Sequence, residues 1–157
     1  MKKRILVIED DTVVAMVYRR LLNAHGFEAE IAENGVRGLK CLEISLPDAV
    51  LLDLMMPKGN GLSVLQAIRA EPKWCHLPVL VMTAAAVPVM VKQAQEAGAD
   101  RVFDKANVKP VAVVNLLHDL LHTTSDKRLL CVTSSGNPES VLDHWPTTPE
   151  GLTKSSA

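Results

Sequence analysis

The stretch AVLLDLMMPKGNG, from Ala49 to Gly61, places a single carboxylate, Asp53, at the end of an apolar run. The run before Asp53 is short and aliphatic, which is typical of a strand buried on both faces of a parallel sheet. The proline and two glycines that follow indicate a loop. Because ligands bind at the carboxyl ends of strands in open α/β sheets, Asp53 lies where a functional site is expected.

Four more aliphatic segments alternate with segments of helical period, which predicts five pairs of strand and helix. The expected strands are residues 4–9, 27–32, 48–53, 78–83 and 100–105. The expected helices are residues 12–25, 35–45, 62–70, 88–97 and 110–121, with Thr12 as the cap of the first. The predicted fold class is α/β, a doubly wound, flavodoxin-like (βα)5 parallel sheet with strand order 2-1-3-4-5.

Length and composition predict one domain, since 157 residues with 48% hydrophobic content can build a full core. After His122 the sequence becomes rich in Ser, Thr and Pro and loses any sustained period. We therefore expect a domain over residues 1–122 and a disordered tail or linker over residues 123–157. A segment that recognises a partner is the alternative for the tail.

Charge and hydropathy exclude several classes of partner. The formal net charge of -1 offers no basic surface for nucleic acid. The longest uncharged segment, Leu77 to Val91, is shorter than a membrane span and contains two prolines. The opening MKKRILVIEDD has too few apolar residues for a signal peptide, so we expect a cytoplasmic protein. Three widely spaced cysteines without a C-x-x-C pair indicate neither disulfides nor a zinc site.

The other strand ends add charged and polar groups beside Asp53. Glu9 and Asp10 follow the first strand, which is normally adjacent to the third in a doubly wound sheet. Three carboxylates this close would force one to hold a proton unless a cation such as Mg²⁺ lies among them. Thr83 and Lys105 end the fourth and fifth strands, so a hydroxyl and an ammonium face the same edge. This set predicts a phosphoryl site.

Four blocks of the sequence resemble the receiver domains of two-component response regulators, of the stand-alone chemotaxis or phosphorelay type. The resemblance covers Lys3 to His122, and the blocks are ILVIEDD, PDAVLLDLMMPKGNGL, VLVMTAAA and GADRVFDK. It implies that Asp53 is the phosphoacceptor and that Asp10 is a direct Mg²⁺ ligand. Glu9 would be a water-mediated partner of the metal, and the backbone carbonyl of Met55 a further ligand.

The same resemblance implies that Thr83 and Lys105 hold phosphoryl oxygens. The residues that would shape the loop after the acceptor are Met56, Pro57 and Gly61. The donor would be phosphohistidine on a sensor histidine kinase or a histidine phosphotransfer protein. The chain would then be no enzyme in the usual sense, but a phosphoacceptor that assists its own phosphorylation and dephosphorylation and signals to a downstream protein.

Two other functions are compatible with parts of this pattern. An interaction module could keep the fold without using the chemistry, because fold alone does not settle function. A phosphatase of the haloacid dehalogenase type would need a second acid two residues after the nucleophile, where this chain has Met55. The five polar residues together favour the phosphorylated switch.

Some helices have more apolar residues than a single core-facing side needs, and this excess predicts two docking surfaces. The first helix, near Val14 and Val17, is expected to meet the phosphodonor. The face around Val89, Met90 and the last helix is expected to meet the output target or a second copy of the chain in a homodimer.

Two positions depart from the pattern of the receiver family. The family lysine is normally followed by proline across a cis bond, but Ala106 follows Lys105, so a trans bond is expected. Val102 occupies the position of a switching aromatic residue and has no ring to turn. Phe103 is not expected to replace it, because neighbouring strand residues point to opposite faces.

Overall fold

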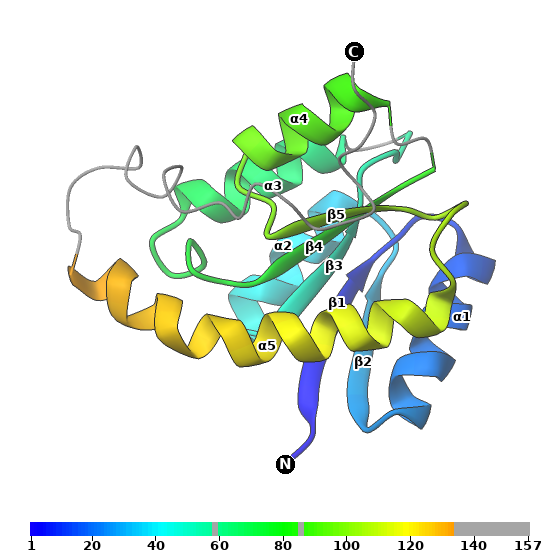
Figure 1. Ribbon diagram of the computed structural model, residues 1–157, viewed down its shortest axis with the longest axis horizontal. Helices are drawn as coiled ribbons and strands as arrows, with labels where there is room; N and C mark the ends of the chain where they lie inside the picture. Colours follow the sequence, from blue (N-terminus) through cyan, green and yellow to red (C-terminus); the bar gives the residue numbers. More distant parts are fainter. Residues whose placement is uncertain (58–59, 85–86, 134–157) are drawn as a thin grey trace.

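A single parallel sheet forms the centre of the computed structural model, which describes residues 1–57, 60–84 and 87–133. Its strands run in the order β2-β1-β3-β4-β5, as predicted (Figure 1). Their bounds are β1 Lys3–Ile8, β2 Phe27–Ala32, β3 Ala49–Asp53, β4 Val79–Thr83 and β5 Arg101–Asp104. All four strand pairs are parallel, so the carboxyl ends of the five strands share one edge.

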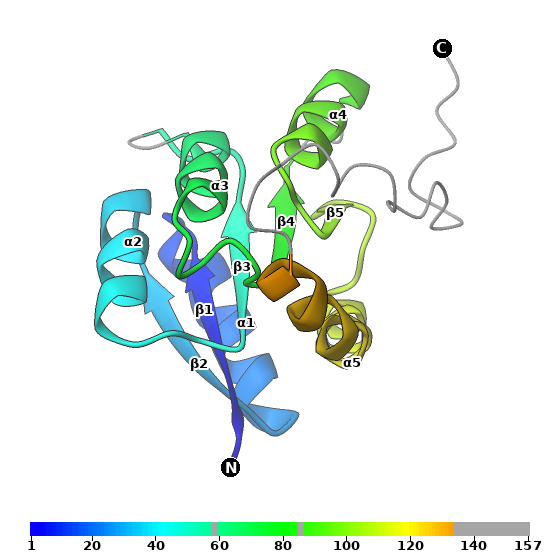
Figure 2. The same ribbon diagram turned by 90° about the vertical axis from the view of Figure 1, so that its left-hand side faces the viewer.

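Helices cover both faces of the sheet, as Figure 2 shows. They are α1 Thr12–Ala24, α2 Gly35–Ile44, α3 Gly61–Ala70, α4 Pro88–Glu96 and α5 Pro110–Thr133. Side chains of α1 and α5 pack in one core cluster, and side chains of α2, α3 and α4 pack in the other. Within the described ranges, no helix is long and apolar enough to cross a membrane.

The central strands explain the continuous apolar runs of the sequence. Every residue of β3 and β4 is buried, because helices lie on both sides of them. Edge strand β2 alternates between buried and more exposed positions. Val102 belongs to the cluster beneath α2, α3 and α4, whereas Phe103 belongs to the cluster beneath α1 and α5. The expected opposite orientation of these two residues is therefore confirmed.

The first helix begins with a different cap from the predicted Thr12. Asp11 is the N-cap, and its Oδ1 accepts hydrogen bonds from the backbone N–H groups of Val13 and Val14. A carboxylate caps a helix at least as well as a hydroxyl, and two good capping residues stand side by side here. The sequence pattern alone therefore did not separate them.

The last helix is longer than predicted. It runs to Thr133 rather than ending at residue 121, so residues 123–133 are helical (Figure 1). No glycine or proline stands between Pro110 and Gly136, so the segment carries none of the usual stop signals. At about 1.5 Å per residue, the extension adds roughly 18 Å of helix. The rest of the predicted tail, residues 134–157, lies outside the described residues.

A salt bridge at the amino ends of the strands ties α3 to β4 and β5. Arg69 donates to Asp100 Oδ2 at 2.9 Å and to the carbonyl oxygens of Gly98, Cys75 and Leu77 at 2.9, 3.1 and 2.7 Å. The same oxygen of Asp100 accepts the backbone N–H of β4's first residue at 2.9 Å. We call Arg69 and Asp100 with these acceptors the Arg69 clasp. It satisfies a largely buried charge pair at the edge opposite the strand carboxyl ends.

Candidate functional site

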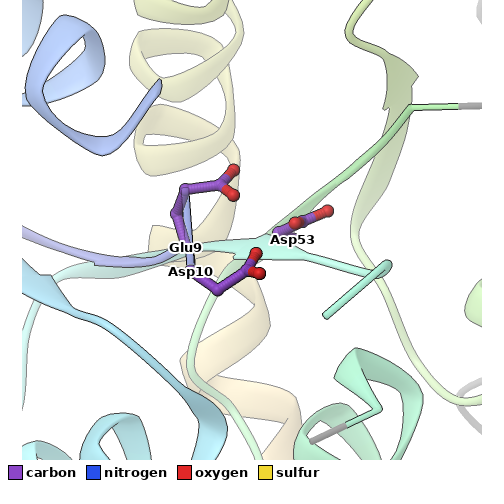
Figure 3. A group of neighbouring side chains, drawn as sticks. All are labelled: Glu9, Asp10 and Asp53. Atoms are coloured by element: carbon purple, nitrogen blue, oxygen red, sulfur yellow. The ribbon is translucent and has the colours of Figure 1, made fainter. Parts of the chain in front are cut away.

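Three carboxylates meet at the carboxyl ends of β1 and β3. The register pairs Ile8 with Leu52, so Glu9 follows β1 at the level of Asp53. Glu9, Asp10 and Asp53 each offer an oxygen within 4.8 Å of the others. Figure 3 shows the three carboxyl groups pointing into one space. Glu9 and Asp53 are each 2% exposed, whereas Asp10 is exposed.

One ammonium group faces these carboxylates. Lys105 Nζ lies 2.6 Å from Glu9 Oε2 and 3.4 Å from Asp53 Oδ2. Among the described residues, it is the basic side chain that forms ion pairs with this cluster. The cluster therefore has more negative than positive charge, and its partly buried position makes that excess costly unless a cation binds. Its ligands are hard carboxylate oxygens, the donor type that suits Mg²⁺.

Glu9 responds to this environment through its pKa. Burial raises the pKa of the Glu9 carboxyl from 4.5 to about 7. The hydrogen bond from Lys105 opposes that shift, and the neighbouring charge of Asp53 adds to it. Without a bound cation, Glu9 is therefore protonated in most molecules below about pH 7.

The backbone around Asp53 is held from three sides. The N–H of Met55 donates to Asp53 Oδ1 at 3.1 Å, and the N–H of Leu54 donates to Met82 O at 2.8 Å. A Cβ added to Gly61 would lie 2.2 Å from the carbonyl oxygen of Asp53. Glycine is thus required where α3 begins against the end of β3, which gives the predicted role of Gly61 in the loop a steric basis. The carbonyl of Met55 as a metal ligand stays a prediction.

Strands β4 and β5 bring the remaining polar residues to the same edge. Thr83 is the last residue of β4 and is fully buried, and its carbonyl accepts the N–H of Lys105 at 2.9 Å. The Lys105–Ala106 peptide bond is trans, as expected. The predicted strand end at residue 105 is one residue too long, because β5 ends at Asp104 and Lys105 begins a turn.

The turn after β5 contains a contribution that the sequence pattern did not reveal. Asp104 is only 8% exposed, and its Oδ1 accepts the N–H of Ala106 at 2.8 Å. Its Oδ2 accepts a hydrogen bond from the side chain of Asn107 at 2.9 Å. Aspartate side chains commonly form turns by accepting the backbone N–H two residues further on. Asp104 at the end of a predicted strand could therefore have been recognised as a turn residue.

The predicted docking surfaces differ in how fully they are exposed. On α1, Val13 and Val17 are exposed, whereas Val14 is half-buried against the core. On α4, Val89 is exposed, whereas Met90 packs partly against the opposite cluster. The exposed apolar surface of α1 therefore centres on Val13 and Val17 rather than on Val14.

A family comparison agrees with this geometry. Residues 5–120 match the model of the response regulator receiver domain. The chain belongs to this family. The receiver is 38% identical over 117 residues to response regulator MprA of Mycobacterium sp. (strain KMS) and to that of Mycobacterium tuberculosis (strain ATCC 25177 / H37Ra). Each match covers 74% of this chain and 48% of the relative, so the chain spans about half the length of these relatives.

Solved structures show the same fold. The CheY-like response regulator receiver domain protein from Methanospirillum hungatei JF-1 superposes with a TM-score of 0.75 at 24% identity, covering 81% of this receiver and 99% of that chain. A response regulator from Chloroflexus aurantiacus J-10-fl superposes with a TM-score of 0.73 at 27% identity, covering 78% of this receiver and 99% of that chain. The receiver thus shares its arrangement of strands and helices with proteins of low sequence identity.

Proposed function

We propose that this receiver accepts a phosphoryl group on Asp53 from phosphohistidine of a sensor histidine kinase or a histidine phosphotransfer protein, in the cytoplasm. The observation that carries the proposal is the placement of a buried Asp53 between two further carboxylates and the ammonium of Lys105. A carboxylate in this setting can act as a nucleophile toward phosphorus. The carboxylates fit Mg²⁺, which Glu9, Asp10 and Asp53 would hold.

The transfer needs little covalent chemistry from the protein. An Asp53 oxygen forms a bond to phosphorus while the bond from phosphorus to the histidine nitrogen breaks, and the electron pair leaves with that nitrogen. When Mg²⁺ is bound, it neutralises negative charge on the transferring group. Lys105 brings a positive charge to the same space, and the hydroxyl of Thr83, at the end of β4, would donate a hydrogen bond to a phosphoryl oxygen.

The product is an acyl phosphate that water later hydrolyses, so the receiver works as a switch rather than as a turnover enzyme. Met55 follows the acceptor by two residues and is half exposed. Its thioether cannot orient an attacking water by a strong hydrogen bond. We expect a long-lived phosphoryl group for this reason. A second position that would affect this lifetime is Ala85, two residues beyond Thr83, and it lies outside the described residues.

The signal would leave through altered contacts with another protein. Val102 is buried and lacks a ring, so an aromatic side chain cannot transmit the change at this position. Movement of Thr83 toward the phosphoryl group would instead draw in the segment that leads to α4. The sequence predicts that the donor docks near Val14 and Val17 of α1, and since Val14 is half-buried we propose that it docks on the exposed Val13 and Val17. The exposed side of α4 with α5 would meet the target or a second copy.

Incubation with a small acyl phosphate and Mg²⁺, followed by intact mass measurement, tests the proposal. The wild type should gain one phosphoryl group, and Asp53→Asn should gain none. Asp48→Asn is the matched control, because Asp48 pairs with Lys3 on the surface and should not affect the gain. An unchanged wild-type mass at saturating donor would instead indicate an interaction module that does not use this chemistry.

A further inference from the structure

The turn that follows β5 carries Lys105, and a single side chain closes it. Asp104 uses both carboxylate oxygens within the turn, one on the N–H of Ala106 at 2.8 Å and one on the Asn107 side chain at 2.9 Å. Its backbone carbonyl also accepts the N–H groups of Asn107 and Val108 at 3.2 and 3.0 Å. Asp104 therefore bonds to the three residues that follow Lys105.

The charge of Asp104 is not explained by an ion pair. In the part of the chain that the structure describes, no basic side chain forms a salt bridge with Asp104. It is also not one of the three carboxylates that could hold a metal ion. A buried carboxylate of this kind is retained through the hydrogen bonds it accepts, and here those bonds hold the turn.

Lys105 lies between two fixed points. On one side its own N–H donates to Thr83 O at 2.9 Å, which ties it to the end of β4. On the other side the next residue, Ala106, is tied to the Asp104 carboxylate. Alanine supplies the N–H that this bond needs, and proline would lack it. With both neighbours fixed, the ammonium reaches Glu9 at 2.6 Å and Asp53 at 3.4 Å.

We infer that Asp104 is a positioning residue for Lys105 in phosphoryl transfer. The inference rests on the proposed function and adds to it a residue that never touches the phosphoryl group. Asp104 acts through the turn, and its removal lets the lysine occupy other positions. Because displacement of a reacting group by about 1 Å can cost on the order of a hundredfold in rate, the effect should be measurable.

The first test measures the rate at which a small acyl phosphate phosphorylates Asp53. Asp104→Ala should slow it by on the order of tenfold to a hundredfold, with Mg²⁺ affinity unchanged. Asp104→Asn keeps an acceptor for the Ala106 N–H and should stay within about threefold of wild type. Asp119→Ala, which removes an exposed acid of α5, is the matched control and should leave the rate unchanged.

A double variant separates positioning from general damage to the fold. If Asp104 acts only through Lys105, Asp104→Ala combined with Lys105→Ala should be no slower than Lys105→Ala alone, within about twofold. A further loss in the double variant overturns the inference. So does an undiminished rate in Asp104→Ala when the wild type is phosphorylated. The backbone hydrogen bonds of the turn remain in Asp104→Ala, so the variant is expected to fold.

The second test does not depend on phosphorylation. An ammonium held by Glu9 and Asp53 exchanges slowly with water and should give a ¹⁵N NMR signal for Lys105, assigned by its loss in Lys105→Ala. That signal should weaken or vanish in Asp104→Ala and persist in Asp119→Ala. Its persistence in Asp104→Ala overturns the inference. If the wild type takes no phosphoryl group, the proposed function fails, while this signal still decides whether Asp104 positions Lys105.

Discussion

At the amino ends of the strands, Arg69 meets one carboxylate and three carbonyl oxygens, whereas at the carboxyl ends Lys105 forms ion pairs with two carboxylates of a cluster of three. The charges of the Arg69 clasp are balanced, since the guanidinium is paired with one carboxylate and each of its nitrogens donates at least one hydrogen bond. The carboxylate cluster of Glu9, Asp10 and Asp53 is unbalanced. The two groups lie at opposite edges of one sheet and are largely buried, except for the exposed Asp10.

The difference indicates what each edge is for. A charge pair in which every guanidinium nitrogen donates a hydrogen bond fixes the elements that it joins. A cluster with excess negative charge is held in place by the rest of the fold and gains from a cation that neutralises it. We therefore expect the clasp to contribute to stability and the metal-free carboxylate cluster to lower it. Each of the following measurements tests one side of this comparison.

Loss of the clasp should have the largest effect on stability. Arg69→Ala leaves Asp100 buried without its cation, so the free energy of unfolding should fall by roughly 3 kcal/mol. Urea unfolding measures this directly. Lys92→Ala breaks an exposed pair with Glu96 and should cost less than about 0.5 kcal/mol. Equal losses in the two variants would show that the clasp is no more than a surface pair.

The carboxylate cluster should make metal-free stability depend on pH through Glu9. The pKa of Glu9 is about 7 in the folded chain and 4.5 without the fold, mainly because of burial. Between these values the folded protein binds more protons than the unfolded one, so stability falls as pH rises through this window. The contribution is fully present below about pH 4.5 and is lost as pH rises through about 7.

Urea unfolding in a chelating buffer from pH 5 to pH 8 measures this dependence. The free energy of unfolding of the wild type, relative to that of Glu9→Gln, should fall as pH rises to about 7 and then level off. A difference that stays constant across the range would mean that burial does not raise this pKa.

Mg²⁺ should neutralise the excess negative charge of the carboxylate cluster and leave the Arg69 clasp unaffected. At ten times its dissociation constant, Mg²⁺ should raise the free energy of unfolding by about 1.4 kcal/mol. The gain should shrink in Asp10→Asn and stay the same in Arg69→Ala, because only Asp10 belongs to the cluster. Thermal unfolding with and without Mg²⁺ is the measurement. An equal gain in wild type and Asp10→Asn would place the cation elsewhere.

The smallest effect is expected from removing one like charge. Asp53→Asn keeps an acceptor for the N–H of Met55 but lowers the repulsion with Glu9 and Asp10. Without metal at pH 8, the variant should be more stable than wild type by roughly 1 kcal/mol. A destabilised variant would show that the ion pair with Lys105 outweighs the repulsion, and the cluster would then resemble the clasp.

The sequence pattern predicted the parts of the molecule that repeat a local rule. Buried runs bounded by Pro and Gly gave the five strands to within a residue or two, and the strand order followed from the fold class. The convergence of Glu9, Asp10, Asp53 and Lys105 followed because the carboxyl ends of parallel strands share an edge. The end of α5 was predicted wrongly because compositional change was weighed above the absence of helix-breaking residues.

Other features depend on contacts distant in sequence. Arg69 sits in the last turn of α3, where a cation is usual, and nothing nearby indicates its salt bridge with Asp100, 31 positions later. The closer approach of Lys105 to Glu9 than to Asp53 likewise depends on how β1 and β5 are placed. Side-chain geometry between separate elements is decided by packing and not by local pattern.

Gly61 shows how a residue with no chemistry of its own can decide whether the proposed acceptor, Asp53, works. The space beside Asp53 O has no room for a methyl group, since a Cβ at position 61 would lie 2.2 Å from that oxygen and 2.7 Å from Leu54 Cα. A Gly61→Ala change would therefore push the end of β3 and the acceptor carboxylate out of place together. In a mutational survey scored by signalling, position 61 should rank with the proposed phosphoacceptor, although it donates no proton, binds no cation and carries no charge.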